Sequence, residues 1–363
     1  MDFLPTSLGT RPRLAVEIRA EGIVAARAEN AAALLAAVAK ADVARQAVVP
    51  GLKAGNITDR IAVAAAVRSA LDQVSGKGSE RGVGRDVTIV VPDGAVRVLL
   101  LDFDQLPSKP AEALPVVRFR LKKLLPFDAD TAAVSYQIMS NQRDAVRVLA
   151  VATPRDVLDE YESVVSAAGY MPGAVLPSTL AALAGLDAAD APALVVNVGS
   201  GWVTTAIVQG GILLLHRSLD VNANAEDASD TYTSVSQTIV DEALQPGGYD
   251  RFDAEASMQS SVVEQAEIRE MMTVVNAEAA SYEVTQAISV AAAYFEDTLR
   301  VSPESLLAAG TMGSERLAAM MQANGLDGFR VQEMVDPGMM EAGAATSAVS
   351  RGWLAGVRGA LKS

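Results

Sequence analysis

Two stretches of the chain alternate short apolar runs with turns, a pattern typical of antiparallel β-meanders. The first contains a predicted strand, a turn and a returning strand, at residues 14–18, 20–22 and 23–28. The second contains three predicted strands, at 193–198, 202–208 and 211–219, joined by Gly199-Ser200-Gly201 and Gln209-Gly210-Gly211. Helix-like segments follow each meander, so the pattern predicts two related halves.

Apolar positions at helical spacing predict several helices outside these meanders. They are expected at 31–40, which is rich in alanine, at 58–74, 155–168 and 283–299, from about 314, and at 341–362. Thr58 is the expected N-cap of the second of these helices. The polar tract 222–283 has only scattered helix signals, and a loop is expected at 245–252.

The middle of the first half has a different order of elements, which predicts a small α+β subdomain. Strands are expected at 87–91, 96–103, 134–139 and 145–152. Between the two pairs of strands, a helix beginning near Pro110 combines an apolar stripe with a basic remainder. The stripe consists of Leu114, Val117, Leu121 and Leu124.

Composition and charge exclude several classes of function. The chain has 363 residues, of which 50% are hydrophobic, and a net charge of −14. Nucleic-acid binding is not expected, because phosphate contacts need clustered Lys and Arg. The absence of cysteine and the single histidine, His216, exclude disulfides, thiolate nucleophiles and multi-histidine metal sites. No run reaches the ~20 apolar residues of a membrane span, and no signal peptide is recognisable, so a soluble cytoplasmic protein is expected.

The basic helix and the residues after it carry a family resemblance. Residues 118–128 read Arg-Phe-Arg-Leu-Lys-Lys-Leu-Leu-Pro-Phe-Asp, and Tyr136-Gln137 follow downstream. This run resembles the PilM family of type IV pilus assembly proteins, which are actin-like relatives of FtsA. The resemblance is strong in residues only at 87–136, 197–219 and 306–317, and in element order it covers nearly the whole chain.

The resemblance implies an α/β, actin-like (ribonuclease-H-like) two-lobe fold with duplicated β-meander and helix halves. It also implies an inserted small α+β subdomain in the first lobe. The expected first-lobe divisions are a core at 1–86, the inserted subdomain with its flanking strands at 87–168 and a return to the lobe at 169–190. The expected second-lobe divisions are a core at 191–221, a subdomain at 222–283 and further core at 284–340. A C-terminal helix at 341–363 is expected to pack on the first lobe.

In function, the resemblance implies a cytoplasmic scaffold of the pilus alignment complex, peripheral at the inner membrane. Such a protein binds the N-terminal tail of a PilN-like membrane partner, and pilus motor or platform proteins are further candidate partners. Family members hold the tail in a groove of the inserted subdomain. Contacts are therefore expected at Arg118, Phe119, Lys122, Pro126 and Phe127. A solvated basic helix face is the alternative interpretation of this run.

The fold also implies a nucleotide site between the lobes, against two glycine turns. The candidate nucleotide-binding residues are Asn197, Gly199, Ser200, Gly201, Thr204, Gly310 and Gly313. Each glycine turn also has a purely structural interpretation, as a connection between regular elements.

Several residues depart from the pattern that an actin-like nucleotide site requires. In the first phosphate loop, Glu17 stands for the usual aspartate, Arg19 for a glycine and Val24 for a lysine. Glu21 adds negative charge where a triphosphate would lie. In the second loop, Asn197 replaces the aspartate that would organise Mg²⁺. The residues therefore favour a scaffold with a degenerate site over an enzyme that uses ATP and Mg²⁺.

Two alternatives of the same fold remain open. One is an active ATPase or nucleotide switch that controls pilus assembly through domain closure. The other is a small-molecule kinase, which needs a catalytic carboxylate; Asp220 is a weak candidate.

The C-terminal segment also has two interpretations. Trp353, Leu354, Val357 and Leu361 lie near one helical face beside basic residues, as in an interfacial membrane helix. The glycines at 352, 356 and 359 instead favour close packing against the body of the protein.

Overall fold

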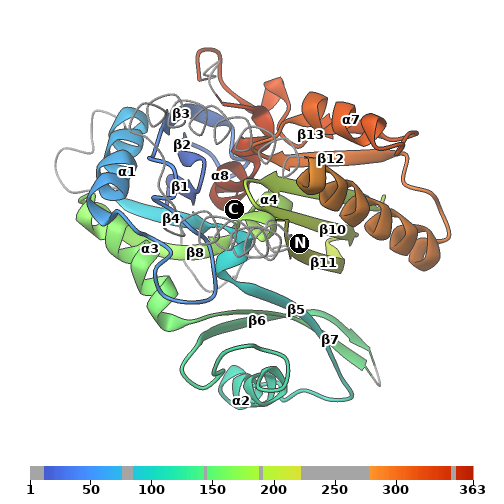
Figure 1. The fold of residues 1–363 in the computed structure, drawn as a ribbon. Helices are drawn as coiled ribbons and strands as arrows, with labels where there is room; N and C mark the ends of the chain where they lie inside the picture. The colour runs from blue at the N-terminus through green and yellow to red at the C-terminus, as the bar shows by residue number, and fades with distance from the viewer. Residues whose placement is uncertain are drawn as a thin grey trace, which may run out of the picture.

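The computed structural model describes residues 12–75, 85–142, 145–187, 191–221, 278–344 and 349–362. Two five-stranded sheets form two lobes, and a third sheet belongs to a smaller unit beside them (Figure 1). The predicted second-lobe subdomain at 222–283 and the loop at 245–252 lie mostly or wholly outside the described residues.

The first lobe is built on a sheet with strand order β3-β2-β1-β4-β8. Its strands are β1 (Leu14–Arg19), β2 (Gly22–Ala28), β3 (Leu35–Ala41), β4 (Asp86–Val91) and β8 (Met171–Pro177). The first three form an antiparallel meander, and β4 and β8 add to β1 in parallel. Helices α1 (Arg60–Val74) and α3 (Arg155–Ala167) pack on one face of this sheet, where their apolar stripes are buried.

The prediction of a helix at 31–40 is wrong, because this segment contains strand β3. The strand pairs with β2 in a register that sets Ala41 opposite Ile23 and Leu35 opposite Ala28. Leu35 and Ala39 are buried in the lobe. The helix propensity of alanine is a weak preference, and pairing with a buried neighbouring strand outweighs it here. The predicted cap Thr58 is also wrong, because the side chain of Asp59 caps α1 by accepting a bond from the Ala62 N–H.

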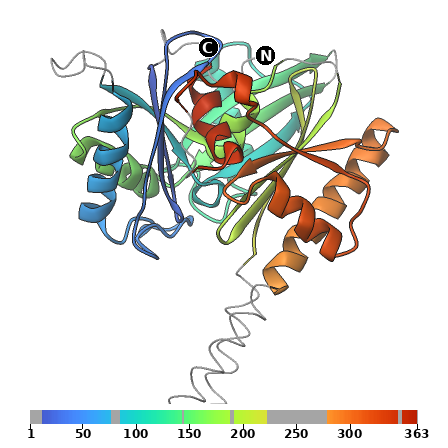
Figure 2. The same cartoon turned by 90° about the horizontal axis from the view of Figure 1, so that it is seen from above.

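The second lobe repeats the architecture of the first with order β11-β10-β9-β12-β13. Its strands are β9 (Ala193–Gly199), β10 (Trp202–Gln209), β11 (Ile212–Asp220), β12 (Ser305–Gly310) and β13 (Arg330–Glu333). Again three antiparallel strands are followed by two parallel ones. A helix at 278–299 and α7 (Ser314–Ala323) cover its outer face (Figure 2). This repetition confirms the duplicated meander predicted from the turns.

The smaller unit is a three-stranded sheet with order β5-β7-β6, covered by one helix. Its elements are β5 (Arg97–Phe103), α2 (Pro110–Leu121), β6 (Ala133–Gln142) and β7 (Ala145–Thr153). Val117 and Leu121 of the predicted stripe are buried against the sheet, whereas Leu124 lies beyond the helix and is exposed. The chain enters this unit after β4, through the short helix η2 (Asp93–Ala95), and leaves it at α3.

Two short helices lie between the lobes and hold them together: α4 (Ser178–Ala184) and α8 (Leu354–Leu361), the latter preceded by η4 (Arg351–Trp353). Helix α8 contacts β1, β2 and β4 of the first lobe and β12 of the second. The C-terminal helix α8 is shorter than the helix predicted at 341–362, since it spans only Leu354–Leu361. A single helical turn, η3 (Pro337–Met339), precedes this region. All eight residues of α8 are buried, which argues against the membrane-surface interpretation.

Candidate functional site

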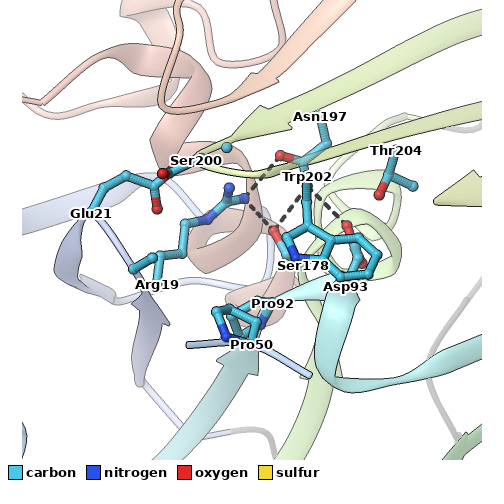
Figure 3. A pocket seen from close by; sticks show the side chains of 12 residues that line it. Arg19, Glu21, Pro50, Pro92, Asp93, Ser178, Asn197, Ser200, Trp202 and Thr204 are labelled. Atoms are coloured by element: carbon cyan, nitrogen blue, oxygen red, sulfur yellow. Dashed lines mark hydrogen bonds between the residues drawn. The ribbon is translucent and has the colours of Figure 1, made fainter. Parts of the chain in front are cut away.

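The first feature of the cleft between the lobes is an arginine that crosses it. Glu17 and Arg19 are two residues apart on β1, so their side chains leave the strand on the same face. The Arg19 guanidinium donates to Glu17 Oε1 at 2.7 Å. It also donates to Ser178 Oγ at 2.5 Å and to Asn197 Oδ1 at 2.9 Å (Figure 3). These partners come from β1, α4 and the second-lobe strand β9. Arg19 therefore links three separate elements through one planar group.

A fully buried polar network extends from this arginine. The Asn197 amide donates to Ser178 Oγ at 3.0 Å and to Thr179 Oγ1 at 2.9 Å. The Thr179 hydroxyl and backbone N–H donate to the Asp93 carboxylate at 2.5 and 3.1 Å. The side chains that bond Asn197 and Thr179 here, and these two residues themselves, are at most 6% exposed. Such a network stabilises one geometry of the cleft, because each buried polar group would lose its hydrogen-bond partners if its neighbours moved.

Glu17 is the fully buried carboxyl group of this network. Burial raises the pKa of its carboxyl above the ordinary value, and the neighbouring Arg19 and Ser178 only partly offset that rise. Its Oε1 atom accepts bonds from Arg19 and Ser178, whereas the buried Oε2 atom has no hydrogen-bond partner among the described residues. The Arg19 charge is therefore what makes a carboxylate tolerable at this position.

The glycine turn of the second lobe faces a first-lobe carboxylate. The backbone N–H of Ser200 donates to Glu21 Oε1, and the Thr311 hydroxyl donates to the same oxygen at 3.0 Å. Glu21 lies in the β1–β2 turn, Ser200 in the β9–β10 turn and Thr311 directly after β12. The carboxylate thus bonds two separate segments of the second lobe from the first.

Little space remains between these side chains. The cavity measures about 30 Å³, room for about one water, whereas pockets that bind small molecules have ~300–1,000 Å³. Trp202, Pro50 and Pro92 are among the residues that line it, and the Trp202 ring packs directly on Gly94. Asn197, one of the residues that line it, is a carboxamide. As these side chains lie, the space between them is therefore far smaller than a nucleotide.

The structure brings together four of the seven predicted nucleotide-binding residues. Asn197, Gly199, Ser200 and Thr204 line the cavity. Gly201 supplies the positive φ of the β9–β10 turn, Gly310 lies against Val198 and Asn197, and Gly313 precedes α7. The sequence did not single out Ser178, Thr179 and Trp202, which belong to no motif. The fold brings Ser178 to Arg19, Thr179 to Asn197 and Trp202 to the cavity.

The predicted partner contacts lie on or just after α2 and are engaged in different ways. Arg118 donates to the carbonyls of Ala129 and Ala132, and Lys122 forms an ion pair with Asp130 at 2.5 Å. Phe119 is 65% exposed beside Lys123, and Pro126 is also exposed. Phe127 lines a cavity of about 510 Å³ facing the loop that contains Lys53. Two of the five side chains therefore hold the subdomain's own loop.

An apolar groove lies between the first lobe and the inserted unit. It encloses about 230 Å³ and is bordered by β8, the edge strand of the first sheet, and β6, an edge strand of the small sheet. Its lining is mostly apolar: Val91, Ala95, Val96, Ala133, Val134, Val151, Val157, Leu158, Gly173, Val175 and Pro177, with Ser135, Thr153, Tyr161 and Glu162 as the polar members. Burial raises the pKa of Glu162, nearby Asp159 adds to the rise and Arg155 opposes it.

Within the part of the chain that the structure describes, no group of three or more His, Asp or Glu side chains is placed so that it could hold a metal ion. In the same residues, none of the helices combines the length and apolarity needed to cross a membrane.

One solved structure has the same fold as this chain. No model of a protein family matches the chain, and no curated protein matches its sequence. The solved PilM-PilN type IV pilus biogenesis complex aligns with a TM-score of 0.63 and 18% identity, over 96% of this chain and 98% of that one. The ethanolamine utilization protein EutJ from Carboxydothermus hydrogenoformans aligns with a TM-score of 0.41 and 13% identity. That alignment covers 99% of this chain and 91% of EutJ. The first of these likenesses confirms the actin-like fold and the structural resemblance to PilM.

Proposed function

We propose that this chain is a PilM-like scaffold of a type IV pilus machine that binds the N-terminal tail of a PilN-like inner-membrane protein. In this proposal the chain is cytoplasmic, is held at the inner membrane through its partner, and works without a nucleotide. The likeness to a structure described as a PilM-PilN complex supports the class of partner. The groove between β8 and β6 is the observation that carries the proposal for this chain.

The groove suits an extended, apolar and basic segment. Among the strands that the structure describes, β8 and β6 each pair on one side only, so each has backbone groups with which an added strand can bond. Apolar side chains line the interior, and Glu162, with Asp159 beside it, supplies negative charge at the border. A tail with apolar anchors and a basic residue would therefore find both kinds of contact.

Blocking the groove is expected to weaken tail binding about tenfold or more. Ser135 is exposed and lines the groove, so Ser135→Arg puts a long cation into the space that the tail would occupy. The measurement is fluorescence polarisation with a labelled peptide of the cytoplasmic N-terminal segment of PilN from the same source. Asn141→Arg is the matched control, an exposed position on the same strand outside the groove. Equal affinity of the two variants would exclude the groove as the binding site.

No saturable heat is expected when the protein is titrated with Mg-ATP up to about 1 mM. In this proposal Arg19, which bonds Asn197 across the cleft, occupies the place of the phosphates, and Glu21 occupies the Ser200 N–H of the second glycine turn. An actin-fold protein that binds ATP, titrated under the same conditions, is the positive control. Binding at micromolar concentration would contradict the proposal and favour the nucleotide-switch alternative.

A further inference from the structure

The contacts of Glu21 amount to a filled anion site. Its Oε1 atom accepts from the Ser200 N–H, in the turn that follows β9, and from the Thr311 hydroxyl, in the turn that follows β12. Both donors belong to the second lobe, whereas Glu21 belongs to the first. Backbone N–H groups at a glycine turn and a nearby hydroxyl are the donors that proteins use for phosphate and carboxylate oxygens.

The geometry around Gly199 shows how closely this site is packed. A methyl group on Gly199 would stand 3.0 Å from Glu21 Oε1 and 3.0 Å from Arg19 Nη1. The carboxylate and the guanidinium therefore approach the glycine turn together, one bonded to it and one beside it. Arg19 brings positive charge to the place where Glu21 brings negative charge, so neither is isolated.

We propose that Glu21 is the permanent ligand of an oxyanion site on the second lobe, and that it holds the two lobes closed in place of a nucleotide phosphate. In actin-like folds a ligand between the lobes can determine how far they close. Here the ligand is the Glu21 carboxylate, which is covalently part of the first lobe. Its effective concentration at the oxyanion site of the second lobe is therefore high, and it does not depend on the concentration of any metabolite. The lobes are then fixed relative to each other whether or not ATP is present.

Removing the Glu21 carboxylate should both loosen the lobes and free the anion site. The chain has no cysteine, so spin labels can be attached at two introduced ones. Ile61→Cys on α1 and Tyr282→Cys on the second-lobe helix are suitable positions, because these side chains are 86% and 60% exposed. Double electron–electron resonance then reports the distribution of distances between the lobes.

With Glu21 present, we expect one narrow distribution that neither Mg-ATP nor millimolar inorganic phosphate changes. Glu21→Ala should increase the width of this distance distribution at least about twofold. Adding inorganic phosphate to that variant should reduce the width again, in a saturable way. Glu21→Gln keeps an acceptor oxygen but no charge, and should lie between the two. Glu315→Ala, at an exposed carboxylate on α7, should match the parent protein.

If Glu21→Ala leaves the distribution of inter-lobe distances unchanged, the inference is wrong. It is also wrong if Glu21→Ala broadens that distribution and inorganic phosphate does not narrow it again. The inference deepens the proposed loss of nucleotide binding and rests on it. Tight binding of Mg-ATP by the unaltered protein would therefore overturn both. An unchanged distribution with no ATP binding would overturn only the role of Glu21. Circular dichroism of each labelled variant verifies that the fold is intact.

Discussion

Replacing Arg19 with alanine is expected to lower the free energy of unfolding by about 3–5 kcal/mol. The change removes the charge that compensates a fully buried carboxylate, Glu17, whose other oxygen already has no hydrogen-bond partner among the described residues. It also leaves Ser178 and Asn197 without the guanidinium that they both bond. Urea denaturation followed by tryptophan fluorescence measures the loss, because Trp202 lines the same cleft.

Two comparisons separate the buried charge from the loss of side-chain volume. Arg13→Ala removes an arginine whose pair with Glu29 is largely exposed, and should cost less than about 0.5 kcal/mol. Arg19→Ala combined with Glu17→Gln removes both charges, and should recover part of the stability lost by the single change. If Arg19→Ala costs no more than Arg13→Ala, the guanidinium does not hold the cleft together.

Replacing Gly359 with alanine is expected to destabilise the protein by roughly 3 kcal/mol or to prevent folding. Helix α8 crosses α4 at this residue, and an added methyl group would stand 1.8 Å from the Ala181 carbonyl oxygen. It would also stand 2.8 Å from the backbone nitrogen of Gly185. Both are backbone atoms, so the two central helices would have to separate. The free energy of unfolding in urea and the yield of soluble protein measure the effect.

The sign of this effect distinguishes close packing from helix propensity. Inside a helix, alanine is normally better than glycine by up to about 1 kcal/mol, so propensity alone predicts stabilisation. Gly338→Ala is the matched control, since an added methyl group there meets nothing within 4 Å. Gly356→Ala is a milder variant for the case in which Gly359→Ala does not fold, because its methyl group would meet the Glu17 carboxylate at 2.9 Å. A Gly359→Ala protein as stable as the parent would contradict the helix crossing described here.

The pattern of apolar runs and glycine turns was sufficient to predict the duplicated meanders, because neighbouring strands joined by short turns are local structures. It was not sufficient at β3, where alanine-rich residues form a strand only because β2 offers a buried partner. Strand β8 and helix α4 were also missed, since their residues are positioned by long-range contacts with β4 and α8.

The chemistry of the cleft divides in the same way. Residue types alone were enough to predict that Glu17, Arg19, Glu21 and Asn197 depart from the pattern of an actin-like nucleotide site, because the charge and size of a side chain are known before its position is. The contacts that these residues make instead depend on the tertiary structure. It brings Ser178 to Arg19 and Ser200 to Glu21, residues 159 and 179 positions apart, and the spacing of residues along a chain carries no information about pairs formed by the closure of two lobes.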